Sequence, residues 1–313
     1  MRVLVTGASG FVGRQTLQPL LDRGFEVHAV ARRALPFAGV AWHEADLLDG
    51  RAAREIVQRV RATHLLHLAW YAEPGKFWTS PENLRWVAAT MELAHAFAAS
   101  GGERIVSSGS CAEYDWRPGV CIEDETPLVP STLYGAAKLA AWNILRVWCA
   151  PPTRLLGGAP EARTTPSLSF AWGRLFFMYG PAEPEAKLVA SVILALLRGE
   201  TARTTTGEQI RDFLHVSDAA GALVALLASD VEGAVNIGSG NGIAVRDLVA
   251  RIGDLLGARE RIEFGAIVPA AAEAPRVVAD TRRLNERVGW RPRFDLRGGL
   301  QQTIDWWRRE LAR

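Results

Sequence analysis

Tyr134 and Lys138 stand four residues apart in STLYGAAKLAAW, a segment whose apolar spacing predicts a helix. Side chains at positions i and i+4 share one helix face, so a phenol and an ammonium would be neighbours here. A phenol with its ordinary pKa of about 10 is a poor acid–base catalyst at neutral pH, but a nearby positive charge favours the phenolate. The pair is therefore a candidate site of proton transfer, although the same spacing is also common by chance.

A cluster of small polar residues, SSGSCAEY at positions 107–114, follows an apolar run. The pattern places Ser107 and Ser108 on a strand and Ser110 at its end, with Tyr114 in the loop beyond. A hydroxyl at the end of a strand can hydrogen-bond a reacting oxygen. The cluster is therefore a second place at which a side-chain hydroxyl could take part in the chemistry.

The segment VLVTGASGFVGRQ places Gly7, Gly10 and Gly13 between an apolar strand and an amphipathic helix. Glycines in this context allow a tight turn and a close approach of pyrophosphate to the helix N-terminus. We therefore predict a dinucleotide site in which Phe11 and Val12 complete the turn. A glycine-rich turn without a ligand is the alternative.

The cofactor preference depends on the end of the second predicted strand, which reads AVARR. An NAD site normally has an acidic residue there to bind the ribose 2′-hydroxyl. This sequence has Arg32 and Arg33, whose guanidinium groups could pair with a 2′-phosphate. The pattern favours NADP(H), while NAD(H) remains possible if the two arginines are simply exposed on a turn.

Strand and helix patterns alternate through the first half of the chain, as in a parallel sheet covered on both faces. The predicted strands are 2–7, 25–32, 63–70 and 103–110, and the predicted helices are 13–24, 50–62 and 83–101. Residues 150–166 are rich in Pro and Gly and predict a loop. We expect an α/β fold: a Rossmann-type doubly wound domain at 1–170, with contributions from about 210–240, and a smaller mixed α/β substrate domain at 171–313.

The composition argues against several classes of protein. The 313 residues carry 36 basic and 34 acidic side chains, and 49% are hydrophobic. This balance argues against a nucleic-acid partner, and no apolar run of about 20 residues predicts a membrane span. Three cysteines form neither a disulfide framework nor a metal-ligand spacing, so we expect no metal and a cytoplasmic protein without a leader segment. The histidines at 64 and 67 would point to opposite faces of a strand.

Taken in order, these motifs resemble the extended short-chain dehydrogenases/reductases, specifically the nucleotide-sugar epimerase/dehydratase/reductase group. The resemblance runs nearly end to end. Its motifs are TGASGFVG (6–13), ADL (45–47), HLA (67–69), the serine cluster, YGAAK (134–138), YGP (179–181), GEQIRDFLHVSDAA (207–220), NIGSG (236–240) and VGWRP (288–292).

The resemblance implies roles for individual residues. The family's catalytic Ser or Thr lies four residues before a tyrosine, which here makes Ser110, before Tyr114, the partner of Tyr134 and Lys138, with Ser108 as the alternative. Asp46 and Leu47 would border the adenine, and Leu68 and Ala69 would line the pyrophosphate and ribose. Arg211 would clamp a nucleotide-sugar diphosphate, with Arg276 as a second candidate. The alternative for Arg211 is an ordinary surface ion pair with Asp212 or Asp218. Two positions depart from the pattern: Trp86 and Phe177 stand where the family has Asn, and Phe177 falls at a substrate contact.

The residues after Ser110 bear on the reaction. Relatives that remove water from the sugar have Asp-Glu there, whereas this chain has Cys111 and Ala112, with Glu113 one position late. We therefore expect NADPH-dependent reduction of a nucleotide-activated keto-sugar of the 4-keto-6-deoxyhexose type. An NAD-dependent nucleotide-sugar 4-epimerase is the alternative, and a non-catalytic NADP-binding sensor is a second. The resemblance also implies a homodimer packed through helices at 83–100 and 133–149.

Overall fold

The computed structural model describes residues 1–150, 168–268 and 273–313, so the predicted loop at 150–166 lies almost wholly outside the described residues. A seven-stranded sheet has the order β11-β7-β5-β4-β1-β2-β3, and every neighbouring pair is parallel. Its strands are β1 (Arg2–Thr6), β2 (Glu26–Ala31), β3 (Val40–Glu44), β4 (His64–His67), β5 (Arg104–Ser110), β7 (Ser169–Leu175) and β11 (Gly233–Ile237). The predicted α/β class with a parallel sheet is confirmed.

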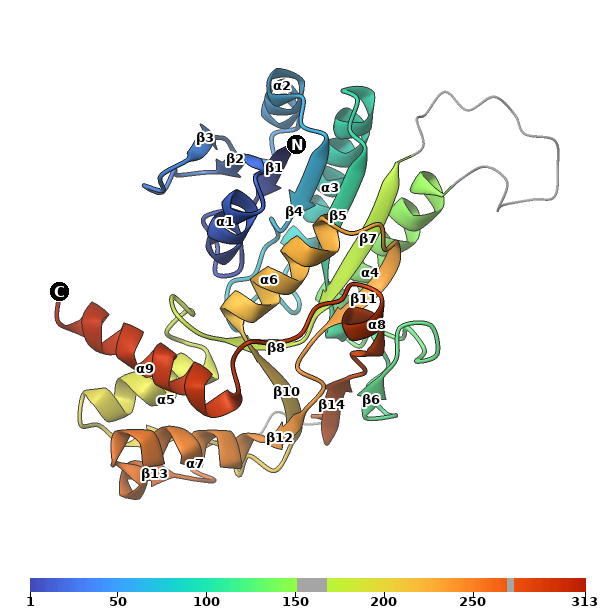
Figure 1. Cartoon of the computed structure of the whole chain (residues 1–313). Coiled ribbons are helices and arrows are strands. Elements are labelled where there is room, and N and C mark those ends of the chain that lie inside the picture. Colours follow the sequence, from blue (N-terminus) through green and yellow to red (C-terminus); the bar gives the residue numbers. More distant parts are fainter. Residues whose placement is uncertain (151–167, 269–272) are drawn as a thin grey trace.

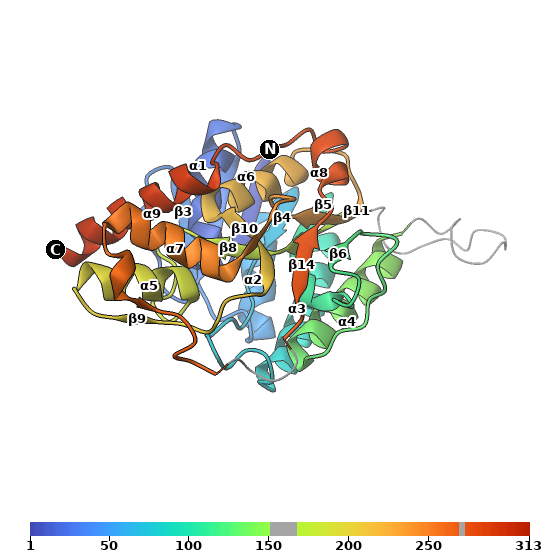
Figure 2. The same cartoon turned by 90° about the horizontal axis from the view of Figure 1, so that it is seen from below.

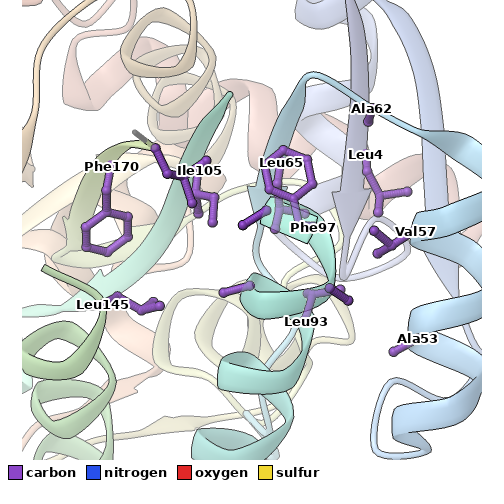
Figure 3. Packing of buried hydrophobic residues seen from close by; sticks show 14 of the residues in the cluster. Leu4, Ala53, Val57, Ala62, Leu65, Leu93, Phe97, Ile105, Leu145 and Phe170 are labelled. Atoms are coloured by element: carbon purple, nitrogen blue, oxygen red, sulfur yellow. The ribbon is translucent and has the colours of Figure 1, made fainter. Parts of the chain in front are cut away.

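Helices cover both faces of this sheet (Figure 1). One face carries α1 (Gly13–Asp22) and α6 (Val216–Leu227), and the other carries α2 (Gly50–Val60), α3 (Glu82–Ala99) and α4 (Leu133–Cys149). Alternate residues of β1 enter the two cores. Leu4 packs with α2 and α3 (Figure 3), while Val3 and Val5 pack with α1 and α6. Strands buried on both faces read as continuous apolar runs, which is why their positions could be predicted.

Strand β3 was not predicted from the sequence. It lies at the edge of the sheet and, within the described part of the chain, pairs with β2 alone. Its residues VAWHE are half-buried or exposed. An edge strand has one paired side and little buried surface, so it lacks the apolar run of a central strand.

The order of the strands reverses between β1 and β4. The chain runs from β1 to β2 and β3 on one side, then crosses to β4, β5 and β7 on the other. In open α/β sheets, ligands bind in the crevice at the carboxyl ends of the strands where the order reverses. The turn after β1, the segment after β4 and the end of β5 all meet at this crevice.

The second half of the chain adds smaller sheets and a further helical layer (Figures 1 and 2). A five-stranded sheet contains β6 (Val120–Cys121), β8 (Phe177–Tyr179), β10 (Ile210–His215), β12 (Gly242–Ala244) and β14 (Arg276–Ala279), and β9 (Ala202–Arg203) pairs with β13 (Ile262–Glu263). The helices are α5 (Leu188–Leu197), α7 (Val245–Leu256), α8 (Arg282–Glu286) and α9 (Leu296–Leu311). Helices α5, α7 and α9 share one apolar core. Within the described residues, no helix is long and apolar enough to cross a membrane.

Candidate active site

The glycine turn packs directly against the segment that follows β4. Gly7 has φ +67°, and a Cβ built on it would lie 2.7 Å from the Ala69 nitrogen and 2.8 Å from the Leu68 carbonyl carbon. A Cβ on Gly13 would collide with the Gly7 carbonyl oxygen. Both positions therefore require glycine, and the turn brings Leu68 and Ala69 to the mouth of the crevice.

The same turn leaves room for a pyrophosphate. A Cβ on Gly10 would have only the Gly7 oxygen nearby, at 3.1 Å, so this side of Gly10 is open to a ligand. Phe11 and Val12 complete the turn, and Val12 caps α1 without a side-chain hydrogen bond. Free donors and a positive dipole at a helix N-terminus favour an anion. The turn thus fits the dinucleotide that the sequence predicts.

Ser110, Tyr134 and Lys138 come together at the end of β5. The Thr132 hydroxyl accepts a hydrogen bond from the Gly135 amide at 3.1 Å and fixes the start of α4. Gly135 lies so close to the Ala112 carbonyl that any side chain there would collide with it. Because α4 approaches the end of β5 this closely, the Tyr134 side chain lies near enough to that of Ser110 for Ser110 to influence the Tyr134 pKa.

The protonation of this group follows from its burial. Burial raises the pKa of Tyr134, and the side chain of Ser110 opposes that rise. Burial lowers the pKa of Lys138 to about 7, and the negative charge of Glu113 opposes that fall. The Lys138 Nζ donates to the Ser108 carbonyl at 2.8 Å. A half-buried tyrosine next to a buried serine, with a buried lysine one turn along the same helix face, forms a site suited to proton transfer.

Glu113 lies next to this group, but its carboxylate is paired with other residues. Its carboxylate accepts hydrogen bonds from the Ser110 amide at 2.7 Å and from Trp172 Nε1 at 2.9 Å. It also forms an ion pair with Arg174 at 2.7 Å, and both side chains are fully buried, at 0% and 1% exposure. Glu113 therefore caps the 3-10 turn η1 (Cys111–Glu113) and is not free to act as the acid or base of a dehydration.

The residues expected around the adenosine lie at the ends of β2 and β3. Asp46 accepts a hydrogen bond from the Leu48 amide at 3.0 Å, and Leu47 is buried in the core next to α2. Arg32 and Arg33 follow β2 directly and are exposed. Their exposure leaves both interpretations of these arginines open, a contact with a 2′-phosphate or a solvated turn.

Arg211 is buried on β10, and its charge meets a carboxylate that the sequence did not identify. The guanidinium pairs with Glu273 at 2.9 Å and lies 5.4 Å from the ring centre of Phe177. The partners expected for an ordinary ion pair, Asp212 and Asp218, instead accept hydrogen bonds from backbone amides. Burial raises the pKa of the Cys111 thiol, and the charge of nearby Arg211 opposes the rise. Arg211 and Phe177 therefore lie close to the end of β5.

Arg276 does not converge with Arg211. In the parallel pair β10 and β14, Arg276 is level with Ile210, and Arg211 is level with Val277. Neighbouring residues of a strand point to opposite faces, so the two arginines project from opposite sides of the sheet. The Arg276 side chain is exposed and lies over Gly119.

An aromatic cluster between β4 and α3 was not identified from the sequence. The rings of Phe77 and Trp78 lie edge-on to Tyr134, with centroids at 4.8 and 5.8 Å, and the Trp78 carbonyl accepts a hydrogen bond from the Tyr134 amide at 3.0 Å. The ring of Trp70 lies 3.8 Å from Lys138 Nζ. The dense aromatic run directly after the HLA motif was the available signal, because that segment begins at the carboxyl end of a central strand.

Comparison with known proteins identifies the family. The sequence profile of the NAD dependent epimerase/dehydratase family matches residues 3–238, more than half of the chain. The chain belongs to this family. Membership confirms the resemblance to the nucleotide-sugar group of extended short-chain dehydrogenases/reductases and the prediction of an enzyme of that type.

Individual members of the NAD dependent epimerase/dehydratase family are similar over nearly the whole chain. A UDP-glucose 4-epimerase of Azospirillum brasilense is 28% identical, with 99% of this chain and 92% of that protein covered. A dTDP-glucose 4,6-dehydratase of Salmonella typhimurium is 25% identical, with 98% and 92% covered. Among solved structures, MoeE5 in complex with UDP-glucose and NAD is 34% identical, with 99% and 100% covered and a TM-score of 0.85.

These relatives bear on the predicted reaction and cofactor. Epimerases and dehydratases are among them, and they favour the alternative 4-epimerase over the ketone reductase that we expected from Arg32. The MoeE5 structures contain NAD, and the preference for NADP(H) stays an untested prediction.

Proposed function

We propose that this protein is an NAD-dependent 4-epimerase of a UDP-sugar. The observation that carries the proposal is the composition of the site: Ser110, Tyr134 and Lys138 converge, while the only carboxylate next to them within the described residues is locked to Arg174. Epimerisation at C4 needs a proton acceptor and a dinucleotide but no second acid–base pair. MoeE5 supports the choice of sugar nucleotide, because its structures hold UDP-glucose or UDP-glucuronic acid with NAD.

In this proposal, the first domain holds the dinucleotide. The glycine turn, with Gly7, Gly10 and Gly13, receives the pyrophosphate, Leu68 and Ala69 line the adjoining ribose, and Asp46 and Leu47 border the adenine. Lys138 contacts the other ribose from the floor of the crevice, next to the Ser108 carbonyl. Bound NAD supplies the oxidation at C4 and its reversal.

The catalytic group moves one proton in each direction. Tyr134 accepts the proton of the C4 hydroxyl as the 4-keto sugar forms and returns it when the alcohol is restored. Ser110 hydrogen-bonds the same oxygen, and the charge of Lys138 favours the phenolate that Tyr134 must form. Because the alcohol must be restored with inverted configuration, the sugar has to present both faces of C4 to the same dinucleotide.

The second part of the chain, from residue 171, would bind the sugar nucleotide. Arg211 is a planar, buried cation near the end of β5 and is suited to a diphosphate. Phe177 lies against the Arg211 guanidinium and contributes an apolar surface where the family has an amide. This substitution would reduce the number of hydrogen bonds to the substrate on that side.

Release and identification of the bound dinucleotide is the first test. The purified protein is denatured, the supernatant is analysed by mass, and the intact protein is incubated with UDP-glucose and UDP-glucuronic acid in D2O. We expect retained NAD, conversion to the C4 epimer of at least one sugar nucleotide and no deuterium in the product. Tyr134→Phe should abolish turnover while retaining the dinucleotide.

Two other outcomes would overturn the proposal. An empty protein that binds NADPH better than NADH, with the preference lost in Arg32→Ala, would restore the keto-sugar reductase. Deuterium at C5 together with loss of water would indicate a dehydratase.

We also propose a homodimer packed through α3 and α4. These helices lie side by side, and they expose Leu84, Ile144 and Val147 at 60%, 49% and 42%. Apolar side chains on neighbouring helices are typical of a self-association surface. Light scattering should give the dimer mass for the wild type and the monomer mass for Ile144→Glu.

A further inference from the structure

Trp70 faces the candidate catalytic lysine. It follows Ala69 after β4, and its ring centre lies 3.8 Å from Lys138 Nζ. A second ring, that of Trp172, is farther away at 5.8 Å. Lys138 is only 2% exposed, so its interaction with the Trp70 face takes place away from bulk water. Cation–π attraction is strongest for tryptophan and grows when the cation is desolvated.

The orientation of the Trp70 ring is fixed by a buried asparagine. Trp70 Nε1 donates to Asn83 Oδ1 at 2.9 Å, and Asn83 is fully buried. The Asn83 amide group donates to the carbonyls of Phe77 at 2.7 Å and Ser80 at 2.9 Å. Because both amide hydrogens are used in this way, only the side-chain oxygen of Asn83 is left to receive the indole. The ring of Trp86 stacks on Trp70 at 6.4 Å and restricts it further.

The titratable groups around this part of α4 provide no counter-ion for Lys138. These groups are Tyr134 on α4, Cys111 and Glu113 on η1, His67 on β4 and Arg174 on β7. Glu113 is paired with Arg174, and burial lowers the pKa of His67 to about 3, so His67 is neutral. Among residues 1–150, 168–268 and 273–313, no carboxylate lies within ion-pair distance of Lys138. The face of Trp70 and the Ser108 carbonyl are its direct contacts, and the charge of Glu113 acts on Lys138 only from beyond ion-pair distance.

We propose that Trp70 is a positioning residue that holds the Lys138 ammonium charged and directed at the Ser108 carbonyl. The role of Lys138 in this inference rests on the proposed function, whereas the contact between Trp70 and Lys138 does not depend on it. Lys138 is required as a cation if it is to favour the Tyr134 phenolate, and burial opposes that charge. The indole face offsets part of this cost without adding a carboxylate that would compete with the phenolate for the proton.

The test is a direct titration of Lys138. The sequence contains three lysines, Lys76, Lys138 and Lys187, so protein labelled with 13C at the lysine ε carbon gives three signals. The signal that disappears in Lys138→Met belongs to Lys138. Its titration is followed in the wild type, Trp70→Leu and Trp70→Phe, with the protein as purified. Leucine keeps the position apolar and bulky, so that water does not replace the ring.

We expect the proton affinity of Lys138 to fall about three- to thirtyfold in Trp70→Leu, which is a pKa lower by about 0.5 to 1.5 units. Trp70→Phe should show a smaller fall, because a phenyl face attracts a cation less strongly. The signals of Lys76 and Lys187 should not move. Trp306→Leu on α9 is the matched control, since it removes an indole remote from Lys138, and it should leave all three titrations unchanged.

Activity gives a second readout. The alkaline limb of the kcat profile should move to lower pH in Trp70→Leu by the same amount as the Lys138 titration, with KM for the UDP-sugar nearly unchanged. An unchanged or raised Lys138 pKa in Trp70→Leu would overturn the inference. If Trp70→Leu does not fold, Trp70→Phe is the test instead. An unchanged Lys138 pKa in Trp70→Phe would equally overturn the inference. A lowered pKa in a protein that does not epimerise UDP-sugars would support the role of Trp70 and refute the proposed function instead.

Discussion

Replacement of Glu113 by glutamine tests whether this carboxylate is structural. Glutamine has nearly the same shape but no charge, and its amide group would face the N–H donors of Ser110, Trp172 and Arg174. Arg174 would then be a buried cation, 1% exposed, without its counter-ion. Removal of one partner of a buried ion pair costs about 3–5 kcal/mol. We expect Glu113→Gln to lower the free energy of unfolding by that amount.

Urea denaturation of a double-mutant cycle measures the effect. Arg174→Met alone should also be strongly destabilising, because it leaves the Glu113 carboxylate buried without a cation. The double variant Glu113→Gln/Arg174→Met should cost less than the sum of the single variants, with a coupling energy of about 2–3 kcal/mol. Glu183→Gln is a matched control: burial raises the pKa of Glu183 to about 8, so the group is mostly neutral at pH 7 and its replacement should be nearly silent.

The opposite result would change the proposed reaction. A Glu113→Gln variant that keeps the wild-type free energy of unfolding but loses turnover would identify Glu113 as an acid or base. The exclusion of dehydration would then fail, since it depends on Glu113 being held by Arg174. A loss of stability with turnover retained at low temperature would support the structural role.

Three further predictions concern the same site. Below pH 7, Lys138→Met should be more stable than the cofactor-free wild type, because burial of the Lys138 ammonium is costly and lowers its pKa to about 7. Between that pKa and about 10.5, the unfolded wild-type chain binds more protons than the folded one, so the wild type gains stability as the pH rises. Urea denaturation should therefore show the advantage of Lys138→Met shrinking by about 1.4 kcal/mol per pH unit above pH 7. Glu273→Gln should tighten UDP binding in calorimetry about two- to fivefold, because Glu273 no longer competes for Arg211, and unchanged affinity would refute that competition. Gly135→Ala should push α4 away from the Ala112 carbonyl and reduce kcat more than dinucleotide retention, and equal activity would contradict the close packing.

Most of the fold could be predicted from the sequence, and the elements that were missed have a physical explanation. The central strands were predicted because both of their faces are buried and their residues form apolar runs. Strand β3 was not, because an edge strand buries too little to leave that pattern. The arginines after β2 indicated NADP(H), whereas the structures of MoeE5 contain NAD. Residue type at a strand end does not by itself show whether a side chain contacts the ribose or the solvent.

By itself, the sequence determined the local geometry of the site. The spacing of Tyr134 and Lys138 places them on one helix face, because the helical repeat is set along a short segment. The three glycines of the first turn likewise indicate a tight local turn, whereas the close approach of Leu68 and Ala69 to Gly7 is a tertiary contact. Only the tertiary structure decided that Glu113 pairs with Arg174, that Glu273 meets Arg211, and that Trp70 faces Lys138. The physical reason is sequence separation: these partners lie on different elements, and their contacts depend on how the sheet and its helices pack.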